Sequence, residues 1–107
     1  MVCTLEHEHI HAKSSGLKTK DALIHTGACW YLGATLITDV DGSGQSSDEQ
    51  LIIFDSLAAG TNHTDRLKCS GEEYNSCHIL EEPIWMATGI HAELNTDKGD
   101  YIVWYSL

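Results

Sequence analysis

The fold is decided by residues 30–38, which read WYLGATLIT and run into a cluster of Asp, Gly and Ser. A stretch of aromatic and branched residues that ends in turn formers is typical of a β-strand. Because side chains alternate between the two faces of a strand, Trp30, Leu32, Ala34 and Leu36 are predicted to share one face.

Comparable stretches recur along the chain, with turn residues between them. Strands are predicted at 51–54 (LIIF), 89–94 (GIHAEL) and 101–105 (YIVWY), and weaker ones at 23–26, 64–68 and 74–80. No stretch predicts a helix. About seven short strands predict an all-β fold, a single antiparallel β-sandwich with Greek-key or jelly-roll-like topology.

Individual positions refine this prediction. In GIHAEL the apolar Ile90, Ala92 and Leu94 are predicted to point inward, so that the polar side chains between them point outward. The single proline, Pro83, is predicted to start a strand or to lie on an edge strand, because it has no N–H to donate to a neighbour.

The chain divides into two parts by composition. Residues 1–20 have little apolar periodicity and are predicted to form an extended N-terminal arm, whereas residues 21–107 form the sandwich domain. The arm has a net charge of +1, and the domain has 14 acids against three bases, a net of −11. Of all 107 residues, 42% are apolar, which is enough for one packed core.

The formal net charge of −10 excludes several kinds of partner. An acidic surface repels the phosphates of nucleic acids and of anionic lipids, so neither is expected to bind. The N-terminus has neither the basic nor the apolar region of a secretory leader, and no apolar run is long enough for a membrane span. We therefore expect a chain that is made in a cytosol.

Three pieces of the body carry a resemblance to a known family. They are GACWYLG at 27–33, LIIFDSLAAGT at 51–61, and EPIWMATGIHA at 82–92 followed by the final strand at 100–105. In this order they resemble the small β-sandwich virion proteins of tailed bacteriophages, over roughly residues 22–106. The histidine-rich arm and the four cysteines depart from that pattern. The resemblance implies a structural part of a head, neck or tail, without catalytic residues or a cofactor.

We therefore expect a non-enzymatic capsid decoration or cement protein on the outer surface of a phage head. The virion would be assembled in the cytoplasm of the bacterial host. The expected partners are the major capsid protein or other virion proteins, and the protein itself is expected to form a homo-oligomer, preferably a trimer. The alternatives are a neck, tail or fibre-associated protein and, in another class, a secreted carbohydrate-binding module whose tryptophans bind sugar.

The final strand supplies the predicted interface. Its residues are apolar or aromatic on both faces, with Tyr101, Val103 and Tyr105 on one face and Ile102 and Trp104 on the other. Only one face of a strand enters the core of a two-layer sandwich, so the other is available to a neighbour. The predicted interface residues are Trp104, Ile102, Leu5 and Ile10.

Two segments are candidates for binding metal. His7, His9 and His11 share one face of an extended arm, and three imidazoles suit a transition metal, although a solvated arm needs no metal. Residues 39–50 approach the template of a calcium loop but lack its closing Glu, and a plain Gly/Ser-rich hairpin loop explains them as well.

The cysteines and the polar residues indicate few reactive sites. Cys69 and Cys77 flank a loop and are candidates for a disulfide across two strands, whereas the default in a cytosol is a buried thiol. No nucleophile motif, phosphate-binding loop or zinc motif is present, and Cys77 and His78 are neighbours whose side chains point to opposite faces of a strand. The sequence thus predicts no enzyme.

Overall fold

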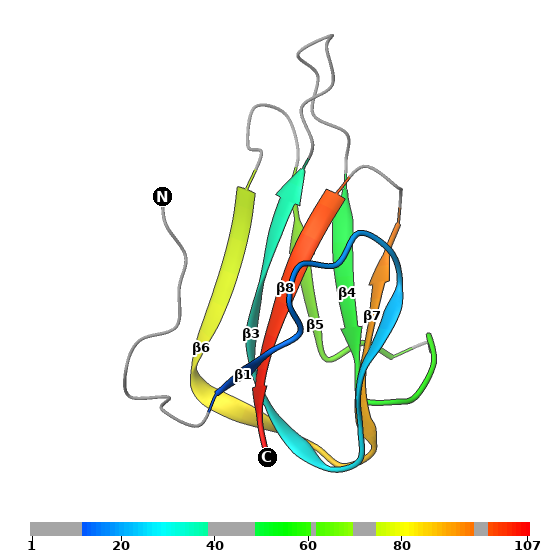
Figure 1. Cartoon of the computed structure of the whole chain (residues 1–107), viewed down its shortest axis with the longest axis vertical. Helices are drawn as coiled ribbons and strands as arrows, with labels where there is room; N and C mark the ends of the chain where they lie inside the picture. Colours follow the sequence, from blue (N-terminus) through cyan, green and yellow to red (C-terminus); the bar gives the residue numbers. More distant parts are fainter. Residues whose placement is uncertain (1–11, 39–48, 61, 70–74, 96–98) are drawn as a thin grey trace, which may run out of the picture.

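The computed structural model describes residues 12–38, 49–60, 62–69, 75–95 and 99–107, which form an all-β sandwich, as predicted (Figure 1). The strands are β1 (Lys13–Ser14), β2 (Ala22–Thr26), β3 (Cys29–Thr38), β4 (Gln50–Phe54), β5 (Asp65–Lys68), β6 (Asn75–Met86), β7 (Gly89–Leu94) and β8 (Gly99–Ser106).

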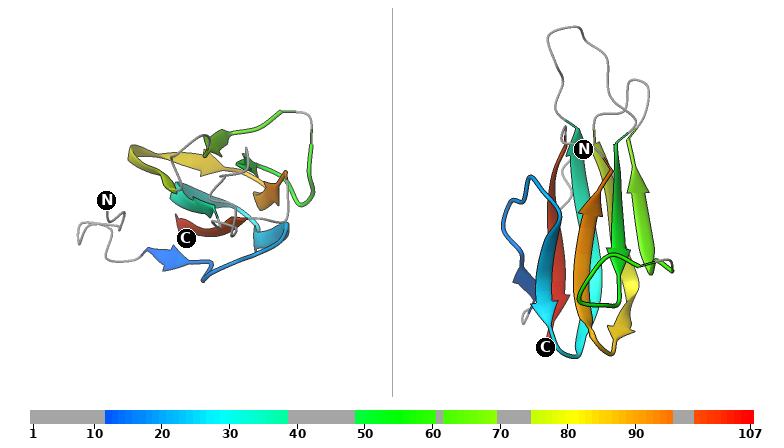
Figure 2. Two further views of the ribbon diagram at one scale, coloured as in Figure 1. Left: turned by 90° about the horizontal axis from the view of Figure 1, so that it is seen from above. Right: turned by 90° about the vertical axis from the view of Figure 1, so that its right-hand side faces the viewer.

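The strands build two antiparallel four-stranded sheets. Sheet A has the order β1-β8-β3-β6 and sheet B the order β2-β7-β4-β5. The right-hand view of Figure 2 looks onto sheet B, with sheet A behind it. The pairs β1·β8, β2·β7, β3·β6 and β4·β5 are those of one long hairpin, and winding it into two layers adds β8·β3 and β7·β4. This connectivity is a jelly roll.

The core lies between the sheets and follows the predicted alternation in most strands. Ile90, Ala92 and Leu94 of β7 are buried, which confirms their predicted inward positions. Tyr101 and Val103 of β8 are also buried. A row of aliphatic and aromatic side chains from both sheets therefore excludes water, and the hydrophobic effect holds the layers together.

Strand β3 departs from the predicted alternation at Leu32. The pairing of β3 with both neighbours shifts between Tyr31 and Gly33, so Leu32 is the extra residue of a bulge. Beyond the bulge the alternation changes phase, and Trp30 lies on the face opposite to Ala34. The prediction that Trp30 shares a face with Ala34 and Leu36 is therefore wrong.

Gly33 is the residue that permits this bulge. Its φ of +139° is a conformation that L side chains rarely adopt, and a Cβ there would lie only 2.2 Å from the carbonyl oxygen of His78. Only glycine lets the two backbones approach so closely.

Strand β6 incorporates Pro83 within its length. The pairing of β6 with β3 jumps from Ile79, opposite Gly33, to Ile84, opposite Tyr31. The four residues 80–83 of β6 therefore lie opposite the single residue Leu32 of β3, and Pro83 lies in this irregular part of an edge strand. This placement spares the ladder the missing N–H of proline and agrees with the predicted edge position.

The second half of the predicted arm lies along β8. Beside β1, the backbone N–H of Ser15 donates to the carbonyl of Val103, and that of Lys18 donates to the carbonyl of Tyr101. The Tyr101 hydroxyl donates to the carbonyl oxygen of Lys20 at 2.6 Å. Residues 13–20, which the sequence assigned to the arm, thus form part of the edge of the sandwich, before the expected start of the domain at residue 21.

Candidate functional site

The outer face of sheet A, which we call face A, carries the most unusual side chains. Register places on it Trp30 and Thr35 of β3, Cys77, Ile79 and Trp85 of β6, and Ile102 and Trp104 of β8, together with Ile37 and Asp100 near one end. Among these described positions Asp100 is the single ionisable acid, although the chain has a net charge of −10. The centre of face A is therefore apolar, whereas exposed Glu81 and Glu82 also belong to β6 and serines and an asparagine lie at its margins.

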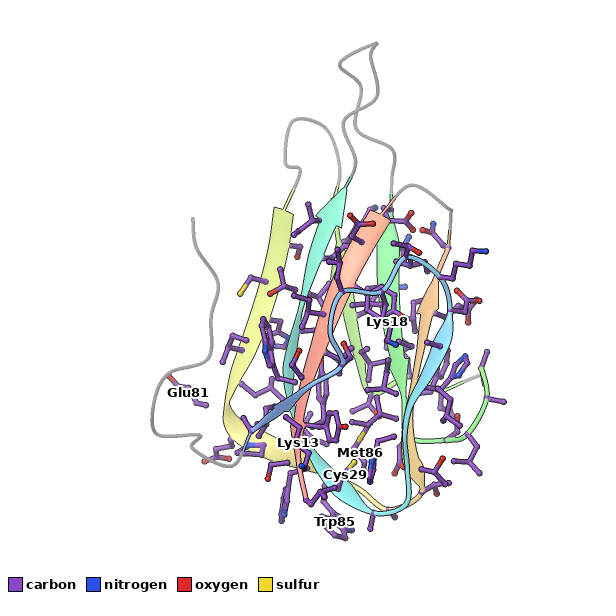
Figure 3. The ribbon with its side chains drawn as sticks, viewed as in Figure 1. Lys13, Lys18, Cys29, Glu81, Trp85 and Met86 are labelled. Carbon is purple, nitrogen blue, oxygen red and sulfur yellow. The ribbon has the colours of Figure 1, made fainter. Side chains whose placement is uncertain are left out.

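Two tryptophans dominate one end of face A. Trp30 and Trp85 are cross-strand partners on β3 and β6, and their ring centroids lie 5.0 Å apart at an interplanar angle of 62°. This is an edge-to-face pair, which aromatic quadrupoles favour. Trp30 is 41% exposed and Trp85 is 51% exposed. Two large aromatic side chains thus remain in water, and Figure 3 shows Trp85 at the end of the sandwich.

The inner side of the same strand ends is packed. Cys29 and Met86 are partners one step along the ladder, and both are fully buried. In Figure 3 they lie inside the sandwich, above Trp85. The backbone beneath the tryptophan pair is therefore fixed by the core.

Asp55 fixes the turn that follows β6. Its carboxylate accepts the backbone N–H groups of Ala87 at 3.0 Å, Thr88 at 2.9 Å and Gly89 at 3.3 Å. Partial burial alone would raise the pKa of Asp55, but these three hydrogen bonds outweigh it and lower the pKa below its ordinary value. The turn two residues after Trp85 is thus held by a charged acceptor.

The predicted interface residues of β8 lie on face A as well. Trp104 and Ile102 are half-buried, and Trp104 pairs with Ser14 of β1 on one side and Gly33 on the other. The other two predicted interface residues, Leu5 and Ile10, lie outside the described residues. The sequence did not distinguish Trp30 and Trp85 as the more exposed tryptophans, because the bulge at Leu32 is not visible in its alternation.

A polar cluster lies at the other side of β6, between the sheets. The Tyr31 hydroxyl donates to Asp65 Oδ2 at 2.6 Å, and His78 Nδ1 lies 2.9 Å from the same oxygen. Burial, the charge of Asp65 and the hydrogen bond to it all raise the pKa of Tyr31, so its hydroxyl stays protonated. No local sequence pattern indicated this cluster, because its members come from three strands.

The chemistry of this cluster is limited by its partners. His78 is half exposed, and Asp65 is its one hydrogen-bond partner among the described residues. His78 Nδ1 lies 3.0 Å from Asp65 Oδ1 and 2.9 Å from Asp65 Oδ2. Neighbouring Cys77 lies on the opposite face of β6, as predicted. The cluster therefore ties β3, β5 and β6 together at the open edge.

The predicted disulfide between Cys69 and Cys77 is wrong. Cys69 is a fully buried thiol whose sulfur donates to the carbonyl of Leu36 at 3.8 Å. Cys77 is disulfide-bonded, but it lies on exposed face A. The two residues belong to different sheets, with Cys69 facing the core and Cys77 facing away from it, so they do not meet across a hairpin. Cys29 is a second buried thiol, and burial followed by the charge of Asp55 raises its pKa.

The predicted metal ligands lie outside the described residues. This holds for His7, His9 and His11 and for the loop at 39–48. Glu49, beside that loop, is buried and accepts the N–H of Gln50 at 3.1 Å. Within the described ranges, no three His, Cys, Asp or Glu side chains are grouped so that they could share a metal ion.

No protein-family model, curated protein or solved structure matches this chain. The part of the chain that the structure describes also contains no helix long and apolar enough to cross a membrane.

Proposed function

We propose that this protein is a non-enzymatic structural subunit of a tailed-bacteriophage particle, a decoration or cement protein on the outside of the head. The observation that carries the proposal is the exposed Trp30–Trp85 pair on face A. It would dock on the major capsid protein or on another virion protein.

The pair has the properties of a protein-binding anchor. Tryptophans are enriched among the residues that dominate binding energy, and burying one typically contributes about 2 kcal/mol or more. Both indoles lie on a rigid sheet whose inner side is packed, so little conformational entropy is lost on docking.

Net charge supports a position outside the head. A chain of charge −10 is repelled by packaged DNA. Copies also repel one another at close range, so each copy needs an apolar contact to stay attached. The Trp30–Trp85 pair provides such a contact.

The jelly-roll fold and the disulfide at Cys77 are consistent with a particle that is found outside the cell. Double-sheet jelly rolls occur in viral capsid domains. The disulfide at Cys77 suits an environment outside the reducing cytosol, which a virion enters when its host lyses. A position in the neck, tail or fibre satisfies the same arguments and is the alternative within the particle.

A carbohydrate-binding module is the second candidate, and it rests on the same exposed tryptophans and on the occurrence of jelly rolls among lectins. Sugar rings stack on open aromatic faces. In the Trp30–Trp85 pair the rings stand at 62°, so the edge of one indole covers part of the face of the other. This geometry favours a protein partner over a flat sugar platform.

Virion proteomics tests the proposal. We expect peptides of this chain in density-purified virions from a culture that expresses it, at a fixed ratio to the major capsid protein. Recovery only in the particle-free fraction would contradict the proposal. A glycan array probed with the same protein distinguishes the carbohydrate-binding module from the virion protein. The carbohydrate-binding module requires that the protein binds a glycan and that Trp85→Ala abolishes this binding.

A matched pair of variants tests the anchor itself. Trp30→Ala and Trp85→Ala should each lower particle binding by about 30-fold, which corresponds to about 2 kcal/mol, while the sandwich stays folded. Leu17→Ala is the control, because Leu17 is also an exposed apolar residue but lies away from the pair. If Trp30→Ala and Trp85→Ala bind particles as tightly as Leu17→Ala does, the tryptophan pair is not the anchor.

A further inference from the structure

The two edges of sheet A carry opposite charges at the same height. The partners that connect Lys13 of β1 to β6 are, strand by strand, Tyr105, Tyr31 and Ile84, and those that connect Ser14 to β6 are Trp104, Gly33 and Ile79. Residues 79–84 of β6 are therefore level with β1. Lys13 is exposed at one edge of the sheet, and Glu81 and Glu82 are exposed at the other. A base at one edge thus matches two acids at the other.

Lys13 and Glu82 also point to the same side of sheet A. Lys13 is opposite Tyr105, which packs against the core, and direct partners in an antiparallel ladder share one side of the sheet. Leu80 and Ile84 of β6 pack against the core as well, so Glu82, midway between them, points to that side too. Both charged side chains stay exposed because they lie at the two outer edges of the sheet.

The number of strands in sheet A lets copies of the chain lie side by side. Neighbouring strands are antiparallel, so in a sheet of four the outer strands β1 and β6 are antiparallel to each other as well. A second copy in the same orientation therefore brings its β1 antiparallel to β6 of the first. We propose that copies associate laterally in this way, with Lys13 of one copy paired to Glu82 of the next. This contact goes beyond the proposed function and needs no particle.

Sheet B offers a second pair of opposite charges for the same lateral contact. The left-hand view of Figure 2 shows its outer strand β2 on the side of β1 and its outer strand β5 on the side of β6. Asp21 directly precedes β2, and the ladder register places it level with Arg66 of β5. Both side chains are exposed, and the Asp21 carboxylate accepts the N–H of Leu94 at 2.8 Å, which fixes its position. Opposite charges thus meet at both sheets.

These charges select the orientation in which two copies meet. Copies of charge −10 repel one another, but at physiological ionic strength this repulsion is screened beyond about 8 Å, whereas touching charges still attract. Exposed ion pairs add little affinity, but they decide which surfaces come together. Because the two edges differ, the contact is head to tail, and it closes into a ring when the rotation per copy divides a full turn. Neighbouring copies then present their tryptophan pairs on the same side.

Zero-length cross-linking of the purified chain, without particles, tests the contact. Equal amounts of unlabelled and heavy-isotope-labelled protein are mixed and treated with a carbodiimide, which joins a lysine amine to a carboxylate in contact with it. Within one copy, three strand spacings of about 4.8 Å separate Lys13 from Glu82, so the link is expected only between copies. We expect peptides of mixed label that join Lys13 to residues 81–82. Their absence from a concentrated sample would overturn the proposal.

An exchange of charges tests the pairing of Lys13 with Glu82. Lys13→Glu and Glu82→Lys each place like charges at the contact, so we expect self-association in sedimentation velocity to fall at least about tenfold in either variant alone. An equimolar mixture of the two should restore it, because every contact then joins opposite charges. Lys68→Glu, at an exposed position on β5, is the control for net charge and should associate like the unmodified chain.

Circular dichroism checks that all three variants keep the sandwich. If either edge variant associates as strongly as the unmodified chain, or if their mixture associates no better than its components, the copies do not meet at these edges. An equal loss in Lys68→Glu would attribute the effect to net charge and overturn the proposed contact.

Discussion

Trp30 and Trp85 face each other across β3 and β6, with their ring centroids 5.0 Å apart, because one extra residue in β3 turns Trp30 away from the core. The same bulge keeps Tyr31 in the core, where its hydroxyl reaches Asp65. The position of the tryptophan pair thus depends on the bulge, and the bulge depends on Gly33.

Substitution of Gly33 should therefore damage both stability and the pair. A methyl group in Gly33→Ala would lie 2.2 Å from the carbonyl oxygen of His78, at a φ of +139°. We expect the free energy of unfolding to fall by about 3 kcal/mol or more, measured by urea denaturation. Gly16→Ala is the control, because Gly16 has a φ of +72° but nothing within 4 Å of the added Cβ. It should cost about 1 kcal/mol, and an equal loss in both variants would argue against the steric role of Gly33.

How far the sequence predicts this fold depends on the strand. In β7 apolar residues alternate with polar ones, so the pattern alone placed Ile90, Ala92 and Leu94 inward correctly. In β8 both faces are apolar or aromatic, and the pattern alone did not decide which of them enters the core. In β3 the pattern is apolar on both sides, and nothing in it marks Leu32 as an extra residue. A bulge is set by the approach of two backbones, which no single strand encodes.

Contacts between distant segments were the least predictable. Cys69 and Cys77 are close in sequence, but the jelly roll places β5 and β6 in different sheets. The cluster of Tyr31, Asp65 and His78 joins three strands that only the tertiary fold brings together. Local pattern therefore predicted the layers of the sandwich but not the polar and sulfur chemistry at its edges.

Loss of the Tyr31 hydroxyl should weaken the open edge of the sandwich. Asp65 is buried and accepts from Tyr31 and from the backbone N–H of Arg66. Tyr31→Phe removes one donor from a buried carboxylate, and we expect a loss of about 1–3 kcal/mol in thermal or urea unfolding. Tyr105→Phe is the matched control and should change stability by less than about 0.5 kcal/mol. A double-mutant cycle with Asp65→Asn should show coupling, and strictly additive losses would contradict it.

Acid should weaken the turn between β6 and β7. The folded pKa of Asp55 is lower than its unfolded value of about 3.9, so its stabilisation is fully present above pH 4 and is lost as the pH falls through the lower, folded pKa. Asp55→Asn should lower the free energy of unfolding by about 1–2 kcal/mol at pH 7 and reduce its dependence on pH below 4. Glu81→Gln, at an exposed position on β6, is the control. Identical acid profiles for Asp55→Asn and the unmodified protein would refute this role.

Alkali should act through Tyr101. Burial, followed by the charge of Asp21, raises the pKa of Tyr101 to about 12. The folded state thus favours the protonated hydroxyl, so the stabilisation is complete below the unfolded pKa of about 10 and is lost as the pH rises towards 12. Tyr101→Phe also removes the hydrogen bond to the Lys20 carbonyl. Absorbance at the tyrosinate band should show one fewer late-titrating group in this variant, and an unchanged titration curve would contradict the assignment.

The response of particle binding to salt should show what holds the protein to its partner. The chain carries −10, so electrostatic attachment to a basic surface would weaken as ions screen it. Apolar attachment through Trp30 and Trp85 should persist, because the Debye length falls from about 10 Å at 0.1 M to about 3 Å at 1 M and copy-to-copy repulsion falls with it. We therefore expect co-sedimentation with particles to be unchanged or stronger at high salt, and Trp85→Ala to remain weak at every salt concentration. If high salt strips the unmodified protein while Trp85→Ala binds normally at low salt, attachment is electrostatic and the tryptophan pair is not the anchor.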